Sequence, residues 1–175
     1  MSLRDDTFRR EVLLRLEEAI LADVGAQRER VVFLAADGRP LLVIDGTPDE
    51  VSIDAETVTM WHDRVDLVTH NHPRGMSFTV DDVTAAITLN AREVNAFTAR
   101  DRFRLLRRPD GRWPELAAAQ HAVHEIEAAL APLVAPVLAP GGLRRDTAEA
   151  IYRRMRWAHF ARRFHGEVDY VEEQR

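Results

Sequence analysis

The sequence contains no cysteine, which removes several kinds of chemistry at once. Without thiols the chain forms no disulfide, offers no thiolate to a metal ion and has no cysteine nucleophile. A structural zinc site usually takes four protein ligands, cysteine among them, so such a site is not expected. Any metal site in this chain must be built from histidine and carboxylate side chains.

Lysine and long apolar runs are also missing. All 24 basic residues are arginine, for which arginine-favouring codon usage is the simpler explanation. No apolar run approaches the length that crosses a bilayer, and the stretch Met1–Asp6 lacks the apolar core of a signal peptide. We therefore expect a cytoplasmic protein without a membrane partner, and the net charge of −5 argues against a general nucleic-acid binder.

The length of 175 residues suits one domain with a sizeable core, or one core with a helical appendage. Apolar residues recur at helical spacing from Thr7 to about Asp23, and a Pro-started helix follows residue 113. Pro132 should end or kink that helix, and prolines at every fourth position mark a linker over 131–140. The other expected elements are a hairpin of 31–35 and 41–44, a helix over 54–62, a strand over 65–69, a helix over 80–91, strands over 93–99 and 103–108, and a last helix over 145–164.

One stretch of the chain combines two histidines with a turn and the start of a helix. His70 and His72 stand at the end of an expected strand, where residues i and i+2 point to the same face. Pro73 and Gly75 then turn the chain, which can bring Asp82 back toward the two rings. Two imidazoles and one carboxylate, with a fourth position left for water, form the ligand set of a catalytic zinc ion. The stretch therefore predicts a Zn²⁺ site.

Asp82 has a second interpretation, as part of a helix cap. Thr79 and Asp82 have the spacing of a capping box, in which an N-cap hydroxyl and an acid three residues later bond each other's backbone N–H groups. In that role the carboxylate would be structural only. Both roles stay open at this point, and the order strand, turn, helix favours the ligand role.

These residues resemble a known signature. The run from His70 to Asp82, His-Asn-His-Pro-x-Gly followed by Ser-Phe-Thr-x-x-Asp, is similar to the JAMM (MPN/JAB) metalloprotease motif in its bacterial RadC-like or phage- and toxin-associated form. The resemblance implies that His70, His72 and Asp82 hold zinc, and that Thr79 replaces a serine that stabilises the tetrahedral intermediate. It also implies an α/β (α+β) fold, with a JAB/MPN-like mixed sheet flanked by helices.

Two features depart from the family pattern. The spacing between His72 and the hydroxyl is one residue shorter than in the commonest form, and the upstream glutamate that acts as general base is not obvious. The equivalent strand is expected at Leu41–Asp45, where side chains alternate and Asp45 is the carboxylate on the relevant face. We therefore predict Asp45 as the base, with Glu50 as a looser alternative, and weak activity on generic peptides.

The resemblance implies a zinc-dependent metallopeptidase or isopeptidase that cleaves a peptide or isopeptide bond. Its partner would be a protein or peptide substrate, for example a ubiquitin-like tail added along the sheet edge. The JAB/MPN-like core is expected over 1–113, and a C-terminal helical extension over 114–175. Two alternatives stay open: a catalytically degenerate scaffold that binds a protein partner, and a RadC-like DNA-associated accessory protein. Homo-oligomerisation is also left open.

Overall fold

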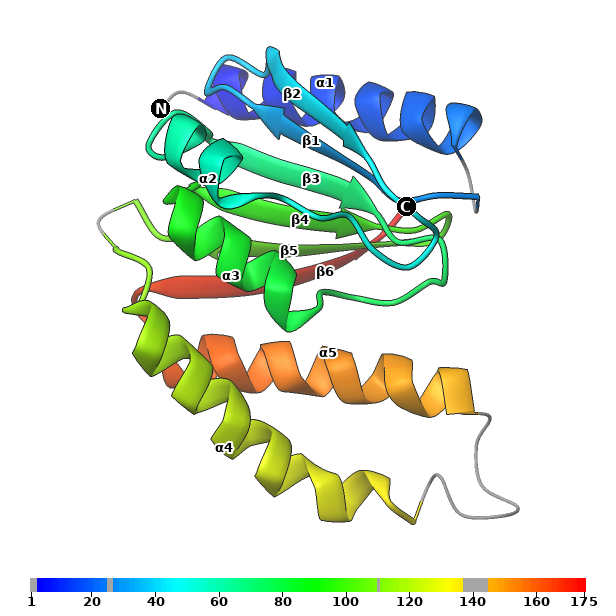
Figure 1. Ribbon diagram of the computed structural model, residues 1–175, viewed down its shortest axis with the longest axis vertical. Helices are drawn as coiled ribbons and strands as arrows, with labels where there is room; N and C mark the ends of the chain where they lie inside the picture. The colour runs from blue at the N-terminus through cyan, green and yellow to red at the C-terminus, as the bar shows by residue number, and fades with distance from the viewer. Residues whose placement is uncertain (1–2, 25–26, 110, 137–144) are drawn as a thin grey trace.

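The computed structural model describes residues 3–24, 27–109, 111–136 and 145–175 of the chain. It is an α+β structure in which helices flank a six-stranded mixed sheet (Figure 1). The strands are β1 (Arg30–Leu34), β2 (Pro40–Asp45), β3 (Leu67–Asn71), β4 (Glu93–Phe97), β5 (Asp101–Arg107) and β6 (Val168–Gln174). The helices are α1 (Leu3–Asp23), α2 (Ala55–Trp61), α3 (Val80–Leu89), α4 (Leu116–Val134) and α5 (Arg145–Arg163).

The strands lie in the order β2-β1-β3-β4-β5-β6. The central strands β3 and β4 pair in parallel, and α3 makes the crossover that a parallel pair requires. The neighbouring pairs on both sides are antiparallel. This topology puts the end of β3, which carries the two histidines of the predicted site, in the middle of the sheet beside the start of α3.

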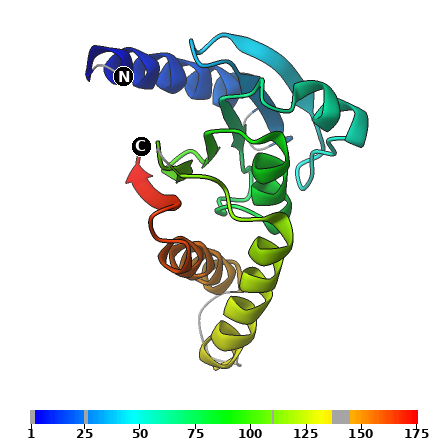
Figure 2. The ribbon, with the colours of Figure 1, turned by 90° about the vertical axis from the view of Figure 1, so that its left-hand side faces the viewer.

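Helices cover both faces of the sheet (Figure 2). On one face α1 packs its apolar stripe over alternate strand residues, in a small cluster made of Leu13, Ile20, Val24, Val32, Leu34, Leu67 and Phe97. The other face carries the larger core, to which α3, α4 and α5 contribute. Alternation along β1 explains this division, because Val31 and Phe33 enter the large core whereas Val32 and Leu34 face α1.

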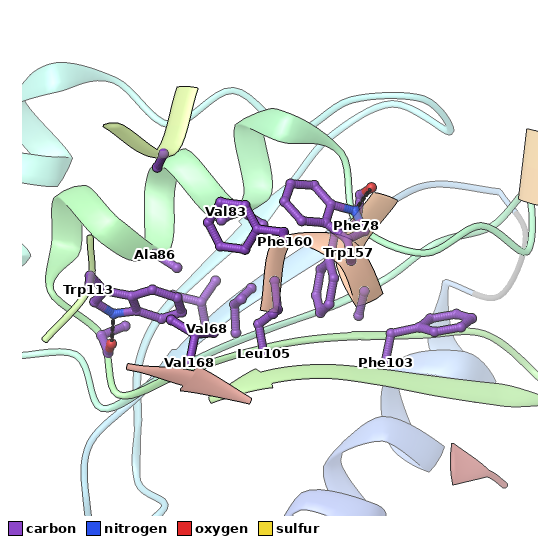
Figure 3. Close-up of a cluster of buried hydrophobic side chains, with 14 of the residues drawn as sticks. Val68, Phe78, Val83, Ala86, Phe103, Leu105, Trp113, Trp157, Phe160 and Val168 are labelled. Atoms are coloured by element: carbon purple, nitrogen blue, oxygen red, sulfur yellow. Dashed lines mark hydrogen bonds between the residues drawn. The ribbon is translucent and has the colours of Figure 1, made fainter. Parts of the chain in front are cut away.

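The C-terminal residues share the large core with the rest of the chain. Trp157 and Phe160 of α5 are fully buried, and their rings continue an aromatic row that begins at Phe78 (Figure 3). The strand β6 then extends the sheet beside β5. The predicted stretches 1–113 and 114–175 are therefore joined by one core and one sheet, and the second stretch contains a strand as well as helices.

Several element boundaries differ from those expected. α4 continues through Pro132 to Val134, so the proline, which removes one backbone N–H donor, does not end the helix. The predicted linker lies partly outside the described residues, from 137 onward. No helix in the described part of the chain combines the length and the apolar character that crossing a bilayer requires.

Candidate metal centre

The two histidines of the predicted site come from the end of β3. His70 is 1% exposed and pairs with Val31 of β1, on the face that α3 covers. His72 follows the strand, and its N–H continues the pairing by donating to the Phe97 carbonyl at 2.8 Å. The rings meet with centroids 4.5 Å apart, and their Nε2 atoms lie 2.9 Å from each other.

A turn after His72 reverses the chain and fixes its ring. Gly75 has φ +76°, which glycine adopts without strain, and its N–H donates to the His72 carbonyl at 3.0 Å. The Nδ1 atom of His72 lies 2.7 Å from the Met76 carbonyl, so we assign Nδ1–H as the donor. This tautomer leaves a lone pair on Nε2, the atom that faces His70, as a metal ligand requires.

Asp82 reaches the same point from the first turn of α3. Its Oδ1 lies 3.3 Å from Nε2 of His70, and its Oδ2 lies 3.5 Å from Nε2 of His72. In a tetrahedral zinc site with bonds of about 2.0–2.1 Å, neighbouring ligand atoms lie about 3.3–3.4 Å apart. The two Asp82 contacts, one from each oxygen, are near this length, and the 2.9 Å between the two Nε2 atoms is a few tenths of an ångström shorter.

The Asp82 carboxylate also caps α3. Its Oδ2 accepts the Thr79 N–H at 2.6 Å, and the Thr79 hydroxyl accepts the Asp82 N–H at 3.2 Å, which completes a capping box. The two interpretations of Asp82 are therefore compatible. The cap holds the carboxylate in the orientation in which its oxygens face the imidazoles.

Substitution of Asp82 by asparagine should separate the two roles. We expect zinc affinity to fall on the order of 100-fold or more, beyond the 10–100-fold that follows loss of an outer-shell partner. The free energy of unfolding without metal should change by about 1 kcal/mol or less, because an amide oxygen still accepts the Thr79 N–H. Competition with a chromogenic chelator and urea unfolding measure the two quantities. Asp81→Asn, in the same helical turn, is the control and should retain zinc. Wild-type zinc affinity in Asp82→Asn would mean that Asp82 only caps the helix.

A fourth side chain, Glu29, lies in the same cluster. It directly precedes β1, is 7% exposed, and its Oε1 lies 3.9 Å from Nε2 of His72. One ligand atom from each of Glu29, His70, His72 and Asp82 lies within 4.8 Å of the others. The 3.9 Å to Nε2 of His72 is longer than the edge of a tetrahedral zinc site, so the position of Glu29 fits a group beside the three candidate ligands.

Asn71, between the two histidines, holds Glu29 in position. Its side chain points away from the imidazoles, because neighbouring strand residues alternate. The Oδ1 atom accepts the Arg30 N–H at 2.8 Å, and Nδ2 donates to the Arg28 carbonyl at 3.0 Å. Both backbone neighbours of Glu29 are therefore bound to the residue that separates the ligands.

Burial and opposite charges shift the pKa values in the cluster. Burial raises the pKa of the Glu29 carboxyl, and the charges of His70 and His72 offset this in part. Burial acts against charge on His72, but the hydrogen bond and charge of Asp82 outweigh it and raise the pKa of that imidazole. The two imidazoles hold the pKa of Asp82 well below its usual value, although burial alone would raise it. Coupled shifts of this kind are common at functional sites.

The structure does not bring Asp45, the predicted base, to the cluster. Asp45 is the cross-strand partner of Arg30, whose side chain points to the α1 face because it alternates with Glu29 and Val31. The Asp45 carboxylate accepts from the Arg30 guanidinium, at 2.9 Å for Nη2, and these bonds lower its pKa. Glu50, the looser alternative, is exposed and accepts the Ser52 hydroxyl at 3.2 Å. Glu29 is the carboxylate that sequence reasoning missed.

The helix α5 supports the loop between the histidines and α3. The Phe78 carbonyl accepts the Trp157 indole N–H at 2.8 Å and the Arg156 guanidinium at 3.2 Å. Arg153 lies with Glu29 and His72 around a second hollow beside the cluster, and its charge lowers the pKa of Glu29 slightly against the effect of burial. The C-terminal part of the chain therefore shapes the surroundings of the site.

Known proteins offer no second line of inference for this site. Compared with family models, with curated proteins and with solved structures, the chain matches none of them.

Proposed function

We propose that the chain is a zinc-dependent metallopeptidase or isopeptidase of the JAMM (JAB/MPN) type. The observation that supports this proposal is the cluster of the buried His70 and His72 with the half-buried Asp82, close to tetrahedral spacing, with the carboxylate of Glu29 beside it. Buried side chains of this kind, two of them imidazoles with facing Nε2 atoms, fit a small divalent cation. Three protein ligands leave a position for water, as catalytic zinc sites do.

The roles of the protein side chains follow from their positions. Bound zinc would lower the pKa of a coordinated water to about 7 and polarise a scissile carbonyl. Glu29 takes the proton of the attacking water at Oε1 and returns it to the leaving amine, a role for which its position 3.9 Å from Nε2 of His72 is suited. The Thr79 hydroxyl, at the N-cap one turn before Asp82, donates to the developing oxyanion. The proposed substrate is a protein or peptide, for which a ubiquitin-like tail is one candidate.

The arginine-rich helix α5 gives little support to a DNA-associated role. Four arginines of α5 are each bound to a carboxylate: Arg153 to Glu149, Arg154 to Asp101 and Glu172, Arg156 to Glu127, and Arg163 to Glu125. These pairs offset much of the positive charge that would attract phosphates. We therefore keep the metallopeptidase as the proposed function.

Metal analysis of the purified protein tests the proposal. We expect about one zinc per chain, with two imidazoles and one carboxylate as protein ligands. His72→Ala should lose the metal, because two remaining ligands hold zinc poorly. His121→Ala is the matched control, since His121 is exposed on α4 and bound to Glu125 at 3.5 Å. Equal zinc in wild type and His72→Ala would refute the metal centre; bound zinc without cleavage of any peptide or isopeptide would favour the scaffold.

A further inference from the structure

A hollow of about 410 Å³ opens directly beside the metal centre. Its walls come from α2, α3, the loop between β2 and α2, and the strands β1 and β3. Glu29, His70, Thr79 and Asp82 are among the residues that line it. Any substrate whose scissile bond lies at the cluster therefore has this hollow next to it.

The floor of the hollow is aliphatic. Val31 and Val68 are buried parts of the core, and Val51, Ile53 and Val58 are half-buried residues packed against it. These side chains would contact the apolar part of a bound group and shield it from water. Burial of one or more methylenes there favours binding.

The charges around the hollow are of one sign. Beyond the cluster, its lining includes the exposed carboxylates of Asp49, Glu50 and Asp81, and no arginine lines it among the residues described. Asp49 is bound to Arg74 at 2.6 Å. Among the described residues, no arginine forms an ion pair with Glu50 or Asp81, and Glu50 accepts the Ser52 hydroxyl. A cationic group at the rim would be attracted, and an anionic group repelled.

We propose that this hollow binds a long basic side chain, lysine or arginine, of the residue next to the scissile bond. Such a side chain has an apolar stem and a charged head, so its stem lies on the valine and isoleucine floor while its head reaches the acidic rim. This inference rests on the proposed function, because the cluster must bind the reacting carbonyl. It adds a substrate class that the ligand set alone does not specify.

Direct binding of hydroxamates to the zinc-loaded full-length protein tests the inference without relying on turnover. Acetohydroxamate reports the metal alone, and the Nα-acetyl hydroxamates of lysine, norleucine and glutamate add a side chain that a small probe can turn into the hollow. We expect the lysine probe to bind at least about 10-fold more tightly than acetohydroxamate, with norleucine between them and glutamate weakest. Isothermal titration calorimetry measures the four affinities.

Variants of the rim carboxylates test whether these groups bind the charged head of the lysine probe. Glu50→Gln combined with Asp81→Asn should remove most of the advantage of the lysine probe over norleucine and leave acetohydroxamate unchanged. Glu18→Gln combined with Asp37→Asn, two exposed acids away from the hollow, is the charge-matched control. Equal affinities of the lysine and glutamate probes in the wild type would overturn the inference while leaving the metal centre intact. Failure of acetohydroxamate to bind the zinc-loaded protein would show that the zinc has no open position, and would overturn the proposed hydrolase and the inference with it.

Discussion

Glu29→Gln is expected to lower peptidase turnover by about 10²–10⁴-fold, the range that a positioned general base contributes. Glutamine has nearly the size of glutamate but takes no proton from the attacking water. Because Glu29 lies outside the tetrahedral spacing of the other three side chains, the variant should retain its zinc. Turnover and zinc content of the same preparation measure both effects.

Asp45→Asn is the informative comparison for this variant. The sequence predicts Asp45 as the base, whereas its carboxylate is bound to Arg30 on the α1 face. We expect Asp45→Asn to reduce turnover far less than Glu29→Gln does. If the two variants exchanged these effects, the role assigned to Glu29 would be wrong; loss of zinc in Glu29→Gln would instead make Glu29 a fourth ligand.

Glu17→Ala is expected to lower the free energy of unfolding by about 3–5 kcal/mol, the usual cost of removing one partner from a buried ion pair. Glu17 of α1 is fully buried, and its carboxylate accepts from Arg102 Nε at 2.8 Å, Asn95 Nδ2 at 2.8 Å and Arg175 Nε at 3.2 Å. Arg102 is 3% exposed, and without Glu17 its remaining carboxylate partner among the described residues is Glu173. The variant leaves a buried guanidinium only partly compensated.

Urea unfolding with and without the substitution measures this cost. Glu11→Ala is the control on the same helix, because Glu11 is exposed and pairs with Arg15 one turn away. A surface substitution of that kind should change the free energy of unfolding by about 0.5 kcal/mol or less. Similar small losses in both variants would show that the network around Glu17 contributes little to stability.

Local patterns predicted the elements around the site, with α3 beginning where expected and β3 lying two residues later in the chain than expected. The apolar spacing and the Thr79-x-x-Asp82 cap predict α3, and the cap is present. The order strand, turn, helix brings His70, His72 and Asp82 together, because each is placed by short-range structure. The positions of these residues relative to one another can be predicted without knowing how distant strands pair.

Glu29 and β6 depend on contacts between distant residues. Alternation puts Glu29, Val31 and Phe33 on one face, but only the pairing of Val31 with His70 shows that this face meets the histidine cluster. The strand β6 carries glutamates that weaken its apolar pattern, and those charges are balanced by arginines of β5 such as Arg102. The sequence does not show that Glu29 meets the histidines or that β6 pairs with β5, because both contacts depend on the order of the strands.

The two hydrogen bonds of Asn71 have a consequence for which chemical group faces the two imidazoles. A slip of β1 by one residue against β3 would turn every β1 side chain to the opposite face. The slip would withdraw the Glu29 carboxylate and direct the Arg30 guanidinium, a cation that cannot accept a proton, at the imidazoles. Asn71 binds the backbone of both Arg28 and Arg30 and so favours the observed register of β1 against β3. In this register the Glu29 carboxylate, and not the Arg30 guanidinium, faces the two imidazoles.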